Sequence, residues 1–166
     1  MAKRQSDNAT TSIFFAGIGG QGVLLASEIV AQVAVRAGLD VKKSEVHGMS
    51  QRGGSVVTIV RFGQKVHSPL ICEGTADVLV AFEPTEGRRH AAVLAKHGAM
   101  IDSSGALAAG LPDPRTLNVF ILGKLAARLP FTQRLWLETI ASRVPARTIE
   151  PNSRAFTLGW AYREGV

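Results

Sequence analysis

The 166-residue sequence has little cysteine, and this shortage excludes several kinds of protein. Its single cysteine, Cys72, can form no internal disulfide and cannot by itself ligate an iron–sulfur cluster. One unpaired cysteine is typical of a protein of the reducing cytoplasm, and we expect Cys72 to pack as a small apolar residue. The sequence also lacks the patterns of a zinc protease, a serine hydrolase triad or a thiamine diphosphate site. It therefore predicts no catalytic residues and no metal ligands in this chain.

Aromatic residues and long apolar runs are scarce as well. Aromatic residues make up 6% of the chain, and glycine or charge interrupts its apolar segments well before the ~20 residues that cross a bilayer. Residues 1–11 are polar and lack the apolar region of a secretory signal, so we expect a flexible tail there. Residues 12–166 are long enough for one core of ordinary size. We therefore expect a single cytoplasmic domain with no membrane segment.

Positive charge is concentrated in the second half of the chain. The formal net charge is +6, and residues 84–166 carry eleven Lys and Arg against six Asp and Glu. These basic residues are scattered, which is typical of solvated helix faces, although they could also form a docking surface for an acidic partner. Nucleic acid is not expected as a partner, because no basic segment alternates with aromatic residues.

Short apolar runs alternate with longer segments of helical periodicity along the chain. The runs at residues 12–16 and 77–82 are almost wholly apolar, which is typical of strands buried on both faces. The alternation predicts an α/β, Rossmann-like fold, in which a mostly parallel, twisted sheet carries helices on both faces. Residues 66–68 are expected to pair with residues 55–62 as an antiparallel hairpin. Strands are predicted at residues 12–16, 39–45, 55–62, 77–82 and 99–102, and helices at residues 23–37, 85–96, 118–129, 132–143 and 151–163.

A glycine-rich segment, residues 17–22, separates the first predicted strand from the first helix, and we call it the glycine turn. Glycines at its first, third and sixth positions permit a tight bend, a close approach of backbone to a ligand, and close packing of helix on strand. The amide groups of the first helical turn would then stabilise an anion without a cationic side chain. The glycines could also serve only to make a close β–α turn. The residues predicted to contact the anion are Gly17, Gly19, Gly20, Gln21 and Gly22.

A second polar loop, residues 48–54, follows the strand predicted at residues 39–45. Its glycines permit positive φ, its serine and glutamine offer neutral hydrogen-bonding groups, and Arg52 offers a fork that can bind a carboxylate or a phosphate. Arg52 could instead tie the loop to a local carboxylate. We expect the two loops to lie side by side, because the strands that precede them should be adjacent and parallel. The candidate ligand contacts in this loop are Gly48, Ser50, Gln51, Arg52 and Gly53.

A dinucleotide is not the expected ligand. In a dinucleotide-binding fold, an acidic residue about 20 positions after the glycines binds the ribose. Glu45 lies at roughly that distance, but Lys42 and Lys43 precede it and the bulky 48–54 loop follows closely. At the end of the strand at residues 77–82, Glu83 could border the ligand site or be an ordinary exposed acid.

The two loops, in this order and spacing, resemble those of the gamma subunits of the 2-oxoacid:ferredoxin oxidoreductases. The resemblance runs from about residue 13 to residue 159 and includes Ser68-Pro69-Leu70-Ile71 and the Glu83-Pro84 pair. The run His47-Gly48-Met49, followed by Gln51-Arg52-Gly53-Gly54, is most similar to the beta subunits of the indolepyruvate oxidoreductases.

This resemblance implies a non-catalytic subunit of an enzyme that decarboxylates a 2-oxo acid oxidatively to an acyl-CoA and reduces ferredoxin. The substrate would be indolepyruvate or another aryl pyruvate. In this family, thiamine diphosphate, magnesium and the iron–sulfur clusters are held by a large partner subunit, and CoA is a co-substrate. The chain would complete the assembly and help to form its CoA-facing wall. The alternative is a stand-alone nucleotide-binding or regulatory module that uses the glycine turn.

Overall fold

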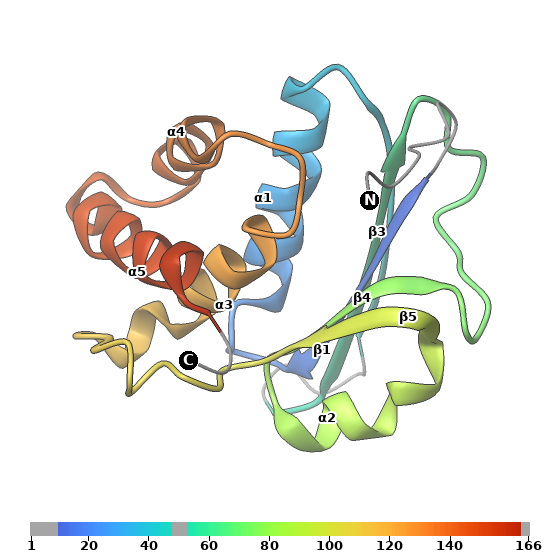
Figure 1. Cartoon of the computed structure of the whole chain (residues 1–166), viewed down its shortest axis with the longest axis horizontal. Coiled ribbons are helices and arrows are strands. Elements are labelled where there is room, and N and C mark those ends of the chain that lie inside the picture. The colour runs from blue at the N-terminus through green and yellow to red at the C-terminus, as the bar shows by residue number, and fades with distance from the viewer. Residues whose placement is uncertain (1–9, 48–52, 164–166) are drawn as a thin grey trace.

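A twisted sheet of five strands forms the centre of the molecule, for which a computed structural model describes residues 10–47 and 53–163 (Figure 1). The strand order is β2-β3-β1-β4-β5, so that the apolar strand next to the glycine turn lies in the middle. The strands are β1 (Thr11–Ile18), β2 (Asp40–His47), β3 (Ser55–Gly63), β4 (Ala76–Ala81) and β5 (Leu94–Ile101). The predicted α/β class is confirmed.

The sheet is mixed, because β3 runs against both of its neighbours. It pairs antiparallel with β1 and with β2, whereas β1 with β4 and β4 with β5 pair in parallel. The antiparallel partner expected at residues 66–68 was wrong, since those described residues form no strand. Both edges of β3 are already occupied, so no edge remains for a hairpin partner. The Val66 amide instead donates a hydrogen bond of 2.8 Å to Asp40 Oδ2 at the start of β2.

Within the described residues, five α-helices cover the two faces of the sheet unequally (Figure 1). Four of them pack on one face over the main core, which includes the fully buried Phe15, Trp136 and Phe156. The short α2 lies on the opposite face, where Phe14, Ala16, Ile59 and Leu79 belong to a smaller cluster. No helix within the described part of the chain is long and apolar enough to cross a membrane. The helices are α1 (Val23–Arg36), α2 (Pro84–Arg89), α3 (Leu117–Ala126), α4 (Gln133–Arg143) and α5 (Ile149–Ala161).

Two local expectations differ from the structure. The helix expected at residues 85–96 ends at Arg89, and residues 94–101 form β5. Pairing with the open edge of β4 thus overrides the helical propensity of an alanine-containing segment, a common outcome when propensity and tertiary pairing compete. Cys72, expected to be packed inside, is exposed on the segment before β4.

Helices α3 and α5 cross at very short range, because glycines lie at the crossing. A Cβ atom added to Gly159 would lie 2.0 Å from the carbonyl oxygen of Phe120, and one added to Gly123 would lie 2.3 Å from that of Phe156. These neighbours are backbone atoms of packed helices, so only a shift of a whole helix could relieve the clash. The short separation of the two helices therefore depends on Gly123 and Gly159.

Gly159→Ala should therefore destabilise the protein although alanine is the better helix former. The gain in helix propensity is about 1 kcal/mol, and overpacking of a tight interface costs about 1–3 kcal/mol or more. Urea unfolding should show a net loss of stability for Gly159→Ala. The control Thr157→Ala, at an exposed position of the same helix, should be near neutral. A Gly159→Ala protein as stable as the control would contradict the close crossing.

A buried lysine, Lys124, holds the segment that directly follows β5. Lys124 of α3, whose side chain is 5% exposed, donates hydrogen bonds of 3.1 Å to the carbonyl oxygens of Asp102 and Ser104. Burial disfavours the charged form of Asp102. The hydrogen bonds from Ser104 and the nearby ammonium of Lys124 outweigh burial, and they lower the pKa of the Asp102 carboxyl below its ordinary value.

This lowered pKa predicts a pH-dependent contribution to stability. A carboxyl whose pKa is lower in the folded state stabilises the fold above its unfolded pKa of about 4, and the contribution is lost as the pH falls through the folded pKa. Asp102→Asn should be less stable than the wild type at pH 7, and the difference should shrink as the pH falls below about 4. Chemical denaturation at several pH values measures it. A difference that stays constant down to pH 2.5 would contradict the assignment.

Candidate functional site

The glycine turn leads directly from the central strand into α1. Gln21 Oε1 accepts a hydrogen bond of 3.0 Å from the Ile18 backbone amide. The backbone amide of Gln21 donates one of 3.2 Å to the Ile18 carbonyl. Gly22 is the N-cap residue and has φ +79°, a left-handed conformation that favours glycine. Among the described residues, no side chain caps this start of α1. Amide groups at the start of α1 are thus left for water or a ligand.

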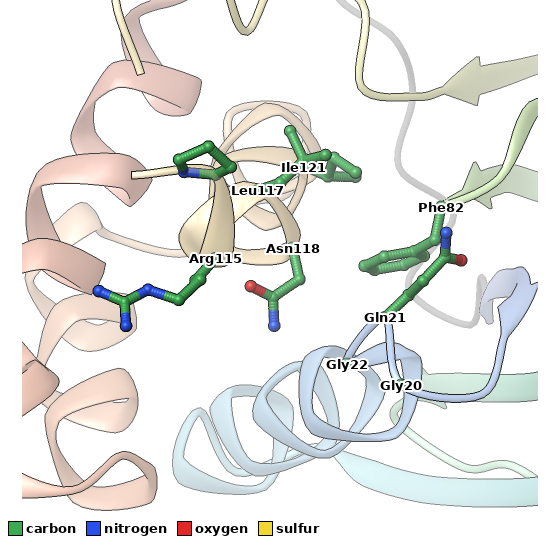
Figure 2. Close-up of a pocket in the computed structure, with 9 residues that line it drawn as sticks. Gly20, Gln21, Gly22, Phe82, Arg115, Leu117, Asn118 and Ile121 are labelled. Atoms are coloured by element: carbon green, nitrogen blue, oxygen red, sulfur yellow. The ribbon is translucent and has the colours of Figure 1, made fainter. Parts of the chain in front are cut away.

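A cavity of about 240 Å³ opens above this turn (Figure 2). The glycine turn borders it on one side, Phe82 at the end of β4 on another, and the start of α3 on the third. In Figure 2, Asn118 extends from the start of α3 toward Gly22, whereas the Arg115 side chain points away from the glycine turn. A Cβ atom at residue 22 would lie 2.3 Å from Asn118 Nδ2, so the two helix starts meet closely at Gly22. The cavity is lined by Gly20, Gln21, Gly22, Phe82, Pro114, Arg115, Leu117, Asn118 and Ile121.

The start of α3 supplies the polar groups that sequence reasoning missed. Its N-cap residue, Thr116, makes no side-chain capping bond within the described chain, and Asn118 Oδ1 accepts a hydrogen bond of 3.0 Å from the Val119 amide. Thr116 and Asn118 follow the glycine turn by some hundred residues, and no pattern in the sequence links them to it. Only the packing of α3 brings Asn118 to the turn.

Among the described residues that line this cavity, Arg115 alone is charged. Its side chain is 89% exposed and forms an ion pair of 2.9 Å with Asp113. The hydrogen bonds of Arg115 to this carboxyl lower the pKa of Asp113, and the bonds to Asp113 raise the pKa of Arg115. The rim therefore carries an arginine that is already partly neutralised, while the cavity beside it offers amide groups and the Asn118 side chain.

The exit of the second loop meets the glycine turn, as expected from the sequence. The Gly19 amide donates a hydrogen bond of 2.9 Å to the Gly54 carbonyl, and Gly53 has φ +73°. The expected adjacency of the two preceding strands was wrong, because β3 lies between β1 and β2. Both strands still end at the same edge, since both run antiparallel to β3. Gly48, Ser50, Gln51 and Arg52 lie outside the described residues.

The strand order also bears on a dinucleotide ligand. Strands lie about 4.8 Å apart, so the end of β2 is about twice as far from the glycine turn as in a fold where the two strands are neighbours. Glu45, near that end, forms an ion pair with Lys43 on the same strand.

Glu83, the other acidic residue considered for the site, does not border the cavity. Its side chain accepts a hydrogen bond of 2.8 Å from the Glu86 backbone amide and caps α2. In the described ranges, no three His, Cys, Asp or Glu side chains gather as metal ligands would.

Comparisons with known proteins agree with this architecture. The sequence model of the family described as pyruvate ferredoxin/flavodoxin oxidoreductase matches residues 12–162. The indolepyruvate oxidoreductase subunit IorB of Thermococcus kodakarensis is 34% identical, over 89% of this chain and 93% of that protein.

Solved structures share the fold. A keto/oxoacid ferredoxin oxidoreductase gamma subunit from Geobacter sulfurreducens superposes with a TM-score of 0.75 at 23% identity, over 90% of this chain and 96% of that one. The 2-oxoglutarate:ferredoxin oxidoreductase of Magnetococcus marinus gives a TM-score of 0.77 at 19% identity, over 94% of this chain and 32% of the longer one. With the family match over nearly the whole domain, these likenesses confirm the resemblance found in the sequence: the chain belongs to the pyruvate ferredoxin/flavodoxin oxidoreductase family and is a small subunit of the 2-oxoacid:ferredoxin oxidoreductase type.

Proposed function

We propose that this chain is the small subunit of a cytoplasmic oxidoreductase that converts indolepyruvate, or another aryl pyruvate, to an acyl-CoA and reduces ferredoxin. The observation that carries the proposal is the 34% identity to an indolepyruvate oxidoreductase subunit over nearly the full length of both chains. A large partner subunit would hold thiamine diphosphate, magnesium and the iron–sulfur clusters, which together supply the decarboxylation and the electron transfer. This chain would complete the assembly and form part of the wall that faces CoA.

The cavity at the glycine turn supports a role next to an anionic co-substrate. Helix starts carry partial positive charge, and those of α1 and α3 border this cavity. Among the described residues, no side chain caps α1, whereas Asn118 Oδ1 accepts a hydrogen bond from the Val119 amide in the first turn of α3. A phosphate group fits a volume of about 240 Å³, whereas a whole CoA molecule does not. We therefore assign to the cavity one phosphate-bearing part of CoA, with the remainder lying against the partner subunit.

The residues of this chain would bind and orient CoA, and none would take part in the chemistry. The proposed contacts are the backbone of Gly17, Gly19, Gly20 and Gly22, the side chains of Gln21 and Arg52, and the loop residues Gly48, Ser50, Gln51 and Gly53. Of these contacts, Gly20, Gln21 and Gly22 line the cavity, and Asn118 and Phe82 line it with them. Phe82 and Ile121 would exclude water from two of its walls.

The first test is reconstitution. The purified chain should show no oxidation of 2-oxo acids with ferredoxin or a dye, because the proposed cofactors belong to its partner. Addition of the large subunit should restore CoA-dependent turnover, with indolepyruvate as the preferred substrate. If the chain instead purifies alone with a bound nucleotide and the large subunit does not need it, the stand-alone module is correct and the subunit role is wrong.

The second test concerns Arg52. A hydrogen bond to a charged partner is worth about 1.5–3 kcal/mol, or about ten- to a hundredfold in affinity. Arg52→Ala should therefore raise the KM for CoA, or weaken assembly, by that factor in the reconstituted enzyme and leave the melting temperature of the chain unchanged. Arg134→Ala is the control, since Arg134 lies on α4 with a side chain that is 88% exposed. If Arg52→Ala lowers the melting temperature of the chain but leaves the kinetics of the assembled enzyme unchanged, Arg52 has only a structural role.

A further inference from the structure

A buried carboxylate lies behind the glycine turn, on the face of the sheet opposite α1. Glu86 of α2 is 8% exposed, and its Oε2 accepts a hydrogen bond of 2.6 Å from the hydroxyl of Ser55. Arg89 and His90 approach the same carboxylate at 3.6 and 3.7 Å. The short hydrogen bond to Ser55 is thus the closest contact of this side chain, and the Arg89 guanidinium compensates its charge more loosely.

Ser55 connects this carboxylate to the glycine turn. It is the first residue of β3, lies opposite Ile18 at the end of β1, and directly follows Gly54. The Gly54 carbonyl accepts the hydrogen bond of 2.9 Å from the Gly19 amide. A continuous set of contacts therefore runs from Glu86 through Ser55 and Gly54 to Gly19 in the middle of the turn.

Neither the capping of α2 nor its packing requires this carboxylate. Glu83 caps the helix, and Pro84 occupies its first turn. A Cβ atom at Gly87 would lie 2.6 Å from the Cβ of Ala81, and the rings of His90 and Phe14 lie 5.2 Å apart, so α2 packs closely on the sheet through other residues. Burying a carboxylate is costly unless it is well paired, so an apolar residue would pack α2 at lower cost.

We propose that Glu86 is a positioning residue for the cavity at the glycine turn. By holding Ser55, it fixes the Gly53–Gly54 exit of the second loop against the turn and so sets the direction of the turn's backbone amides. This role rests on the proposed function, in which the turn leads into the amides at the start of α1 that face a phosphate of CoA. Glu86 itself touches no ligand, because it lies on the far face of the sheet and does not line the cavity.

The direct test follows hydrogen exchange of the Gly19 amide in the full chain by NMR. Ser55→Ala removes the donor, and Glu86→Gln keeps the volume but weakens the acceptor. Both variants should speed hydrogen exchange of the Gly19 amide, by about tenfold for Ser55→Ala. The separate variant Ser55→Thr keeps the hydroxyl and should exchange at the wild-type rate. The Phe82 amide, bonded to the Ala16 carbonyl on the other side of β1, should be unaffected and serves as the internal reference.

The matched control is Glu83→Gln, which weakens the cap of α2 without touching Ser55. If this variant speeds Gly19 exchange as much as Ser55→Ala does, or if neither Ser55→Ala nor Glu86→Gln changes it, the positioning role is wrong and Glu86 only stabilises α2.

Kinetics of the reconstituted enzyme separate this inference from the proposed function. Ser55→Ala should raise the KM for CoA severalfold with kcat unchanged, and Ser55→Thr should restore it. Faster exchange at Gly19 with an unchanged KM for CoA would uphold the tie to Glu86 and overturn the assignment of CoA to the glycine turn.

Discussion

The antiparallel pairing of β3 with both of its neighbours is the constraint on which the site depends. Because β3 separates β1 from β2 and runs against each, the ends of β1 and β2 and the start of β3 all meet at one edge of the sheet. The start of β3 thereby lies directly against the glycine turn, and the Gly19–Gly54 hydrogen bond closes the contact. A parallel arrangement of β1 beside β2 would have placed the end of β2 there instead, as in a dinucleotide-binding fold.

The two faces of the sheet contribute differently to this edge. On one face, the close crossing of α3 and α5 places the start of α3 over the glycine turn, and the cavity lies between α3 and the turn. On the other face, α2 is short, and it brings a buried carboxylate to the first residue of β3. The polar groups at the edge are therefore held from both faces, while the cavity opens on one.

This arrangement suits a subunit that binds without reacting. Amide groups at helix starts favour an anion through fixed dipoles, so they need no titratable side chain and no metal. An arginine on the rim, already paired with Asp113, adds little local charge of its own. The chemistry of the proposed enzyme would then belong to the partner, and the small subunit would contribute shape and an electropositive wall.

The sequence by itself determined the elements whose signals are local. Residues 17–22 predicted the turn, because glycine tolerates the φ of +79° found at Gly22, and the periodicity of residues 23–37 predicted α1. The family resemblance was also readable, since it depends on motifs and their spacing. The strand order, the change of residues 94–101 from helix to strand, and the arrival of Phe82 and Asn118 at the turn were decided only by the tertiary structure. The reason is physical: each depends on which edges and faces remain free after β3 and α1 have packed, and no local pattern records that.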